Sequence, residues 1–396
     1  MTESFQSVID WLIDGARSAQ QIDLFMAETC ERLVARGVPL YRVGVFVRTL
    51  HPSTLGRNFI WKPGEDVKVG AMAHGDEVGE EFLLSPLYKV FYQGEEVRQR
   101  MTNGAASNAP FFADMVAEGA TDYIAFPLLM SDGAAHASSW VTRAKGGFTD
   151  AQIDGLRSVI PSLTRMIEIF LLRRTAAGLL DNYVGARAGT RILAGQIKRG
   201  HTETMNAAIW LSDLRGFTKL SDRLSSETVV QILNAYFDCQ VPAILAQGGE
   251  VLKFMGDGLL AVFPIADDAS DATLVCTRAL DAAKECRALI AKLSHDTGTE
   301  TIDGFRFGLA LHVGRVLYGN IGGGDRLDFT CIGPAVNLAA RIEKIAGNLG
   351  RSVVVSSLFN TYAGVPFTDV GEFAVAGFSA PERVYGLPDE TSSARH

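Results

Sequence analysis

Residues 250–263, EVLKFMGDGLLAVF, decide the fold of the second half of the chain, because they predict two short β-strands around a Gly-Asp-Gly turn. Asp-Gly between apolar, β-prone runs is a strong hairpin signal, since both residues of such a turn favour positive φ. Asp257 is therefore predicted at the hairpin tip. Lys253 is four positions earlier, so in an unbulged strand its side chain leaves the sheet on the same face. A carboxylate suited to a metal ion and an amine thus share one face, although an ordinary surface hairpin has the same pattern.

The composition indicates a globular protein of more than one domain. The chain has 396 residues, more than one core usually supports, so two domains are expected. Hydrophobic residues make up 47% and charged residues 21%, as in ordinary globular proteins. The net charge of −8 argues against an extended nucleic-acid surface. A small phosphate ligand held together with metal ions is compatible with it.

The cysteines and the apolar runs indicate the compartment. The five cysteines form no CxxC pair, which fits a reducing environment and predicts buried, unpaired thiols. No segment reaches the roughly 18 uninterrupted apolar residues of a membrane span. The first ten residues, MTESFQSVID, lack a basic region followed by an apolar one. We therefore expect a cytoplasmic protein without a membrane span.

Residues 1–150 are predicted to form an α+β domain with one sheet and terminal helices. The elements follow from helical spacing, β-branched runs and capping residues. They are helices over 5–13 after Ser4 as a cap and over 21–36, strands over 40–50, 58–61, 122–130 and 136–143, and a helix after Thr149 as a cap. This order, with GFTD before the last helix, resembles a GAF-type sensory domain over roughly residues 1–172. The resemblance implies a domain that binds a small ligand or dimerises.

No ligand of this domain can be named from its histidines or aromatic residues. His51, His74 and His136 lack the paired spacing of metal or haem ligands, so we expect satisfied or exposed side chains. Four aromatic residues are candidates for a ligand cavity, but core packing is the preferred interpretation for each. They are Trp61, Phe82, Tyr123 and Trp140.

Residues 151–201 are predicted to be a helical linker that joins two chains and transmits a signal. Apolar residues recur in alternating steps of three and four, which predicts a dimerisation seam. The seam comprises Ile153, Leu156, Ile160, Leu163, Ile167 and Phe170. Pro161 is expected to kink or divide this helix. A basic run with Arg187, Arg191, Lys198 and Arg199 follows, and by itself fits a solvated face.

Residues 202–390 are predicted to form an α+β domain of the ferredoxin-like, or palm, type. The apolar run AAIWLSDL ends near Asp213, and a helix, the hairpin, a second helix and a further strand follow in the order βαββαβ. In this topology the first strand and the hairpin are neighbours. Asp213 and Asp257 can then approach each other although they are 44 positions apart.

Three groups of residues in this domain carry candidate chemistry. Two acids at strand ends suit a pair of divalent cations that clamp a triphosphate. Asn337 and Arg341 are spaced i, i+4 on one helix face, where an amide and a guanidinium could contact a ribose and a phosphoryl group. The backbone amides of Leu214, Arg215, Gly216 and Phe217 precede a helix and offer a phosphate site. The alternative interpretation of either acid is an ordinary capping residue. The alternative for Asn337 and Arg341 is an exposed helix edge without a ligand.

From about residue 202 to 387 the chain closely resembles the catalytic domain of class III adenylyl cyclases. Four motifs carry the resemblance in the family's order and spacing: SDLRGFTKLSD, GGEVLKFMGDGLLAVF, HVGRVLYGNIGG and TCIGPAVNLAARIE. The resemblance implies that Asp213 and Asp257 hold two Mg²⁺ or Mn²⁺ ions. It further implies that Lys253 and Thr330 read adenine, that Asn337 positions ribose and that Arg341 stabilises the transition state.

The resemblance also implies a reaction and an assembly. The expected reaction converts ATP to 3′,5′-cyclic AMP and pyrophosphate in a homodimer whose two active sites each use both chains. Thr330 resembles a Thr-bearing subgroup with bicarbonate-responsive members, and Lys253 argues for ATP, because guanylyl cyclases carry an acid there. Ala376 replaces a triphosphate-binding lysine of the family, for which Arg306 or Arg326 are candidate substitutes. The alternatives are a guanylate cyclase and a catalytically silent nucleotide-binding scaffold.

Overall fold

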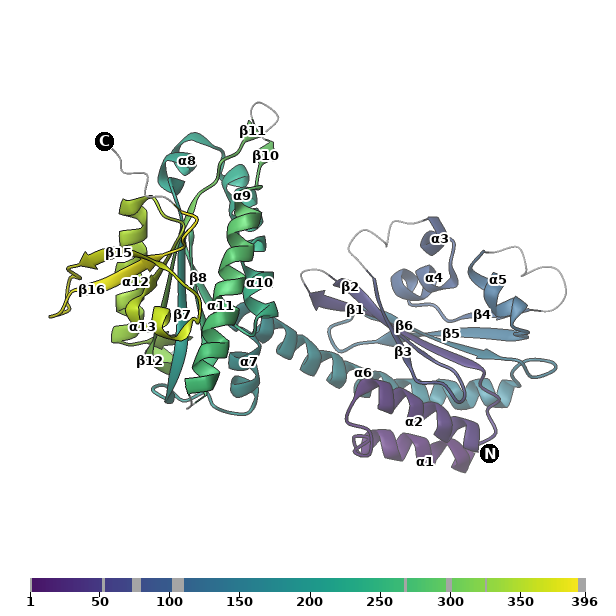
Figure 1. The fold of residues 1–396 in the computed structure, drawn as a ribbon. Helices are drawn as coiled ribbons and strands as arrows, with labels where there is room; N and C mark the ends of the chain where they lie inside the picture. The colour runs from purple at the N-terminus through teal and green to yellow at the C-terminus, as the bar shows by residue number, and fades with distance from the viewer. Residues whose placement is uncertain are drawn as a thin grey trace. The chain divides into compact units, whose positions relative to one another are not determined.

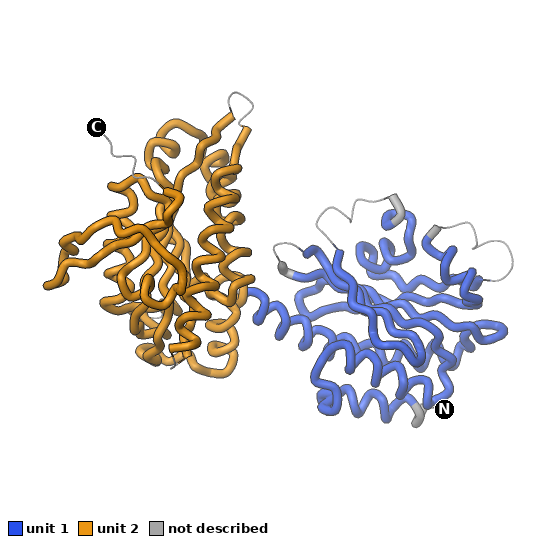
Figure 2. The backbone as a smooth tube through the Cα atoms, viewed as in Figure 1, with its two compact units in different colours: residues 1–179 blue, residues 180–396 orange. Residues whose placement is uncertain are grey.

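The chain forms two compact units, residues 1–179 and residues 180–396 (Figure 2). The structure is a computed structural model, and it describes residues 2–51, 54–72, 80–101, 110–266, 269–296, 301–324 and 326–390. His74, one of the three histidines considered as ligands, lies outside the described residues. Residues 151–201, which we predicted as a linker, are divided between the two units.

The first unit is built on one antiparallel sheet with the strand order β3-β2-β1-β6-β5-β4 (Figure 1). Its strands are β1 (Arg42–His51), β2 (Thr54–Trp61), β3 (Lys68–Met72), β4 (Val97–Arg100), β5 (Asp122–Leu129) and β6 (Ala135–Thr142). The four predicted strands correspond to β1, β2, β5 and β6, which form the hairpins β1–β2 and β5–β6. The sheet places β1 next to β6, so the two hairpins join at the centre.

Helices cover both faces of this sheet (Figure 1). One face carries α1 (Thr2–Ile13), α2 (Ile22–Ala35) and α6 (Asp150–Val184), and the other carries α3 (Glu80–Leu83), α4 (Pro86–Gln93) and α5 (Pro110–Ala117). Strand β5 shows why both faces are covered: Ile124 and Phe126 point to the first core, and Tyr123 and Ala125 to the second. Helix α1 begins before Ser4, so Ser4 is not its cap.

The histidine and aromatic candidates in this unit mostly have structural partners. His136 accepts a hydrogen bond at Nδ1 from the backbone N–H of Arg48 at 2.9 Å. Trp61, Tyr123 and Trp140 are buried in the two cores, as preferred from the sequence. Phe82 packs against the second core and also lines a small cavity next to β1 and β2.

Helix α6 corrects the predicted dimerisation seam. Five of the six seam residues are buried in the core of the first unit, and Phe170 packs against that core. They are Ile153, Leu156, Ile160, Leu163 and Ile167. A helix packed on a sheet and a helix in a coiled coil have nearly the same apolar period, so the spacing could not separate them. The helix also runs through Pro161 as one element and is not divided there.

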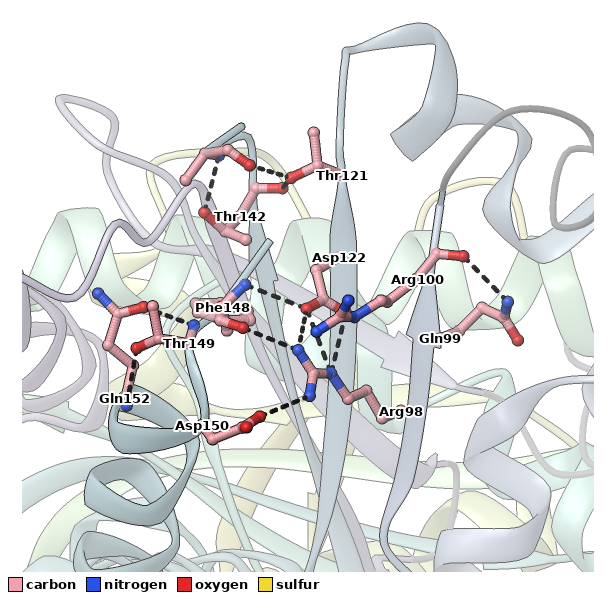
Figure 3. Close-up of polar contacts among 11 residues, drawn as sticks. Arg98, Gln99, Arg100, Thr121, Asp122, Thr142, Phe148, Thr149, Asp150 and Gln152 are labelled. Atoms are coloured by element: carbon pink, nitrogen blue, oxygen red, sulfur yellow. Dashed lines mark hydrogen bonds and ion pairs between the residues drawn. The ribbon is translucent and has the colours of Figure 1, made fainter. Parts of the chain in front are cut away.

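A buried acid ties the start of α6 to the sheet (Figure 3). Asp122 is fully buried, and its Oδ2 accepts hydrogen bonds from Arg98 Nη2 at 2.7 Å and from the Phe148 backbone N–H at 3.1 Å. Arg98 also donates to the Phe148 carbonyl at 2.8 Å and lies 3.5 Å from Asp150. Thr149 Oγ1 accepts from the Gln152 N–H, which confirms Thr149 as the helix cap.

The second unit has a larger sheet with the order β15-β16-β14-β12-β7-β9-β8, and β13 pairs with β12. The strands are β7 (Thr202–Leu214), β8 (Glu250–Met255), β9 (Gly258–Ile265), β12 (Phe307–Gly323), β13 (Arg326–Ile332), β14 (Val353–Ser356), β15 (Thr368–Phe373) and β16 (Glu382–Gly386). A separate pair comprises β10 (His295–Asp296) and β11 (Thr301–Ile302). The order β12-β7-β9-β8 is that of the predicted βαββαβ motif. The sequence interpretation did not include β13 to β16, which extend the sheet beyond β12.

The two faces of this sheet carry different helices. One face packs on α9 (Ser226–Asp238), α10 (Val241–Ala246), α11 (Ala269–Ile290) and α13 (Ser357–Tyr362). The opposite face packs on α7 (Ala186–Leu193) and α12 (Pro334–Leu349), and α8 (Phe217–Arg223) follows β7. All five cysteines are free, and four of them are buried, as predicted.

One stretch among the described residues, Ser226–Ala246, has the length and composition of a membrane span. This is weak support for a span, because helices of folded domains pass the same test. The stretch is divided into α9 and α10, and it contributes Tyr236, Ala243 and Ile244 to the core.

We predict that Asp122→Asn destabilises the first unit by about 3 kcal/mol, because it removes the charged partner of Arg98 and a buried acceptor. Urea unfolding of the full chain, followed by the fluorescence of Trp11, Trp61 and Trp140, measures this loss. Asp154→Asn is the matched control, since Asp154 forms an exposed pair with Arg157, and we expect a change below about 0.5 kcal/mol. Equal effects of the two substitutions would contradict the role given to Asp122.

Candidate active site

The β8–β9 hairpin is present, and its turn lies one residue earlier than predicted. Met255 pairs with Gly258, so Gly256 and Asp257 form the two-residue loop. Gly256 has a φ of 67°, whereas Ala16 is the one non-glycine residue with positive φ in the described part of the chain. Only the first loop position therefore uses the left-handed region, as in a type II′ turn. Asp257 is at the tip, as predicted.

Strand β8 contains an irregularity that the sequence interpretation did not include. The register shifts between Val251 and Lys253, so β8 has an extra residue there. Lys253 then lies opposite Leu260, whose side chain is buried in the core beneath α7 and α12. Lys253 therefore leaves the sheet on the face that carries α7 and α12. The assumption of an unbulged strand was wrong.

Strand β7 brings Asp213 to the hairpin tip. Asp213 pairs with Gly258 on β9 and with Gly308 on β12, so it lies between both neighbouring strands. Burial and the negative charge of Asp213 together raise the pKa of Asp257 to about 6. The strand order thus brings together the two acids predicted to bind metal.

This pair of acids suits divalent cations. Among the described residues, neither carboxylate forms an ion pair with a basic side chain. Their mutual repulsion, which contributes to the raised pKa of Asp257, is relieved when a cation binds. In the described ranges no three His, Cys, Asp or Glu side chains are placed so that they could hold a metal ion together. Mg²⁺ commonly uses one or two carboxylates together with substrate phosphates and water, so Asp213 and Asp257 fit such ions.

The turn after Asp213 is only partly free to bind phosphate. The Arg215 backbone N–H donates to the Arg306 carbonyl at 2.8 Å, so this amide is already used. Leu214 belongs to β7 and is buried, and Gly216 has a φ of 77° before α8 begins at Phe217. The predicted four-amide phosphate site is therefore wrong at Arg215. The amides of Gly216 and Phe217 are the better candidates.

The structure separates the two arginines that we considered as substitutes for the lysine missing at Ala376. Arg306 precedes β12 and bonds to the turn after Asp213, whereas Arg326 begins β13 opposite Gly323, at the other end of β12. A cavity of about 220 Å³ beside the turn is lined in part by Arg215, Arg287, Arg306 and Arg351. Arg306, and not Arg326, is therefore near the acid pair.

Lys253 is on β8 and Thr330 on β13, two strands that contact each other although they do not pair in the sheet. The positive charge of Lys253 reaches Cys331 on β13, where it opposes the burial that raises the pKa of this thiol to about 11. Thr330 is 4% exposed, and its Oγ1 has no hydrogen-bond partner among the described residues. Strands β8 and β12 are joined by Tyr318, whose hydroxyl donates to Glu250 at 2.7 Å.

Asn337 and Arg341 lie on the exposed face of α12. The buried face of this helix carries Ala335, Ala339, Ile342 and Ala346. Glu343 is also buried and pairs with Arg215 at 2.6 Å, beside the turn that follows Asp213. Arg341 and Glu343 are two residues apart, which is about 200° around a helix, so Arg341 points away from that turn.

Within one chain the acid pair and the Asn337–Arg341 pair do not form one site. Ala335, at the start of α12, lies against Gly314, whereas Asp213 pairs with Gly308. Six strand residues span roughly 20 Å. Arg341 is nearer to the turn along the helix axis, because Glu343 contacts Arg215 there, but it lies on the exposed face of α12. The two predicted groups of site residues therefore lie on different surfaces.

The ion pair between Arg215 and Glu343 was missed from the sequence. Glu343 adjoins Ile342 and lies three positions before Ala346, both on the buried face of α12. A charged residue at an apolar helical spacing was the available signal, since such a residue is buried only with a partner.

Comparisons with known proteins agree with the resemblance of the second unit to nucleotide cyclases. Residues 200–387 match the family model described as the adenylate and guanylate cyclase catalytic domain. An adenylate cyclase of Anabaena cylindrica is 31% identical over 162 residues, which are 40% of this chain and 31% of that protein. Adenylate cyclase 1 of Rhizobium meliloti is 31% identical over 151 residues, which are 37% of this chain and 21% of that protein. The matched regions thus span about a third or less of these relatives.

Two solved structures are similar over about half of the chain. The adenylyl cyclase CyaB from P. aeruginosa is 28% identical, with a TM-score of 0.41, over 48% of this chain and 97% of that one. The guanylyl cyclase Cya2 is 28% identical, with a TM-score of 0.39, over 48% of this chain and 98% of that one. The family model and the two adenylate cyclase relatives support a catalytic domain of the adenylate and guanylate cyclase family at residues 200–387.

Proposed function

We propose that this protein is an adenylate cyclase, which converts ATP to 3′,5′-cyclic AMP and pyrophosphate. The observation that carries the proposal is the convergence of Asp213 and Asp257 at the tip of the β8–β9 hairpin, where neither forms an ion pair with a basic side chain of the described residues. This arrangement occurs in the part of the chain that matches the cyclase model. Guanylate cyclase activity and a catalytically silent scaffold are the alternatives.

In the proposed reaction the 3′-hydroxyl of ATP attacks the α-phosphorus, and the bond to pyrophosphate breaks. Asp213 and Asp257 would hold two Mg²⁺ or Mn²⁺ ions. When bound, such ions favour the deprotonated 3′-hydroxyl and offset the charge on the phosphates. Asn337 positions the ribose, and Arg341 stabilises the charge of the transition state. Most of the catalysis is then positioning and charge stabilisation.

Lys253 and Thr330 support adenine as the base. An ammonium group can donate to an adenine ring nitrogen, whereas at the corresponding edge of guanine it faces donors. The buried Thr330 Oγ1 lacks a protein partner in the described residues, so a base could provide one. The family model covers adenylate and guanylate cyclases alike, so the choice of ATP rests on these two side chains.

We further propose a homodimer with two shared active sites. Within one chain Asn337 and Arg341 point away from the acid pair, so a second chain is needed to complete a site. A two-fold dimer would supply the acids from one subunit and Lys253, Thr330, Asn337 and Arg341 from the other. A monomer is then inactive.

The first unit is proposed to be a GAF-like sensory domain that acts through α6. Helix α6 belongs to the core of this unit and continues to Val184 in the second unit. A change of packing in the first unit would therefore act on a helix that enters the catalytic unit. Bicarbonate or another small molecule is the proposed regulator, and the cytoplasm the proposed location.

We predict that the full chain forms cyclic AMP from ATP in the presence of Mg²⁺ or Mn²⁺, and little cyclic GMP from GTP. Lys253→Glu should lower kcat/KM for ATP at least tenfold and lower that for GTP much less, because it reverses the charge that faces the base. Chromatography of the products measures both values. A wild-type protein that forms no cyclic product from either nucleotide contradicts the enzymatic proposal, and a preference for GTP contradicts the substrate.

We predict that Asp257→Ala and Arg341→Ala are each inactive alone and recover up to about a quarter of wild-type activity when mixed. In a shared-site dimer half of the mixed pairs are expected to be heterodimers, and each of these has one intact site. The measurement is cyclic AMP formation after subunit exchange, checked with two differently tagged chains. Confirmed heterodimers without activity would rule out shared sites.

We predict that Arg306→Ala raises the KM for ATP about tenfold, since Arg306 is next to the acid pair and suits the triphosphate. Arg326→Ala is the matched control, because Arg326 lies at the other end of β12, and its KM should be within about twofold of wild type. Equal effects of the two substitutions on KM would show that Arg306 does not bind the triphosphate.

A further inference from the structure

The side chain of Arg215 follows a narrow path between β12 and α12. Its Nη2 lies 2.6 Å from Glu343 Oε1 and donates to the Glu343 backbone carbonyl at 3.1 Å. A Cβ at Gly308 would be 1.6 Å from this Nη2, and a Cβ at Gly347 would be 2.7 Å from Nη1. A side chain at either glycine would have to displace the guanidinium, so the two glycines and Glu343 together form a slot that Arg215 occupies.

Arg215 is only two residues from Asp213, so it is also close to the acid pair. Its positive charge opposes the rise in the pKa of Asp257, and it opposes the rise in the pKa of Glu343, which burial causes and Asp213 increases. One cation is therefore within reach of three carboxylates. It forms its ion pair with Glu343, and the other two have no basic partner among the described residues.

An arginine next to a metal site competes with the metal. A guanidinium forms paired hydrogen bonds with a carboxylate and uses the same oxygens that a divalent cation needs. If Arg215 turned toward Asp213 or Asp257, metal binding would have to break that pair. The slot gives the guanidinium a different carboxylate, that of Glu343, and the Glu343 backbone carbonyl accepts a hydrogen bond from the same Nη2.

We propose that Glu343 is a positioning residue that holds Arg215 away from Asp213 and Asp257 and so keeps these two carboxylates open to divalent cations. The inference rests on the proposed function, since it assumes that the acid pair binds metal. The competing interpretation is a simple brace between the turn after β7 and helix α12. If the ion pair is only a brace, it stabilises the fold, and Arg215 does not compete with metal ions for the two carboxylates.

The test is Mn²⁺ binding to the full chain, measured by electron paramagnetic resonance without nucleotide. Glu343→Gln frees Arg215, and we expect the Kd for Mn²⁺ to rise about tenfold, as for other residues that support metal ligands. The double variant Arg215→Met with Glu343→Gln removes the competing cation, so its Kd should return to within about threefold of wild type. A brace predicts that the double variant binds no better than Glu343→Gln.

Arg215→Met alone provides a second test if Glu343→Gln does not fold. Our proposal expects its Kd to be no higher than that of wild type, because the competing cation is gone. A brace predicts a higher value, because the turn loses its attachment. Thermal melting of each variant shows which ones are folded at the assay temperature.

Glu203→Gln is the matched control, because it makes the same chemical change in another ion pair of the second unit. Glu203 pairs with Arg187 and Arg191 near the start of β7, whereas Asp213 is near its end. The Kd of this variant should equal that of wild type. An unchanged Kd in Glu343→Gln, or a double variant that is not restored, overturns the proposal.

The readout separates this proposal from the proposed function. If the chain binds Mn²⁺ through Asp257 and shows the expected pattern, the role of Glu343 stands even where no cyclic nucleotide forms. If wild type and Asp257→Asn bind Mn²⁺ equally weakly, the acid pair is not a metal site and both proposals fail. If cyclic AMP forms while Glu343→Gln binds Mn²⁺ normally, only the role of Glu343 is lost.

Discussion

The antiparallel pairing of β7 with β9 on one side and β12 on the other is the constraint on which the second unit depends. This register puts Asp213 opposite Gly258 and Gly308 at once, so the end of β7 lies beside the hairpin tip. A shift of one residue would turn Asp213 to the other face of the sheet. The alternation of buried residues along β7, with Ala208 and Trp210 in one core and Ile209 in the other, fixes that register.

The acid pair is costly to the isolated domain and useful for chemistry. Burial and the negative charge of Asp213 make the ionised form of Asp257 costly in an empty site, and a bound cation removes this cost. The domain nevertheless supplies a cation nearby in Arg215 and keeps it on Glu343. The charge of Arg215 still acts on Asp257 at a distance, while among the described residues neither Asp213 nor Asp257 forms an ion pair with a basic side chain.

Helix α12 has two faces with separate tasks. Its buried face holds the helix on the sheet and reaches the turn after Asp213 through Glu343, and its exposed face presents Asn337 and Arg341. In the proposed dimer, one helix would therefore support the metal turn of its own chain and contact nucleotide in the partner's site. The first unit uses its long helix in a similar way, since α6 completes a core and then continues into the second unit.

The sequence by itself determined the local elements and the residue types that carry chemistry. Apolar alternation gave the strands, Gly-Asp-Gly gave the hairpin, and Thr149 gave a helix start, because each depends on neighbours in the chain. Only the tertiary structure decided what covers the apolar stripe of α6 from Ile153 to Ile167. Helices packed on a sheet and helices in a coiled coil have nearly the same apolar period, so the sequence could not separate them. The tertiary structure also decided that Lys253 follows a bulge, that the Arg215 amide is used by Arg306, and that Arg215 pairs with Glu343. These contacts join positions up to 128 residues apart, and no local pattern in the sequence encodes their distances.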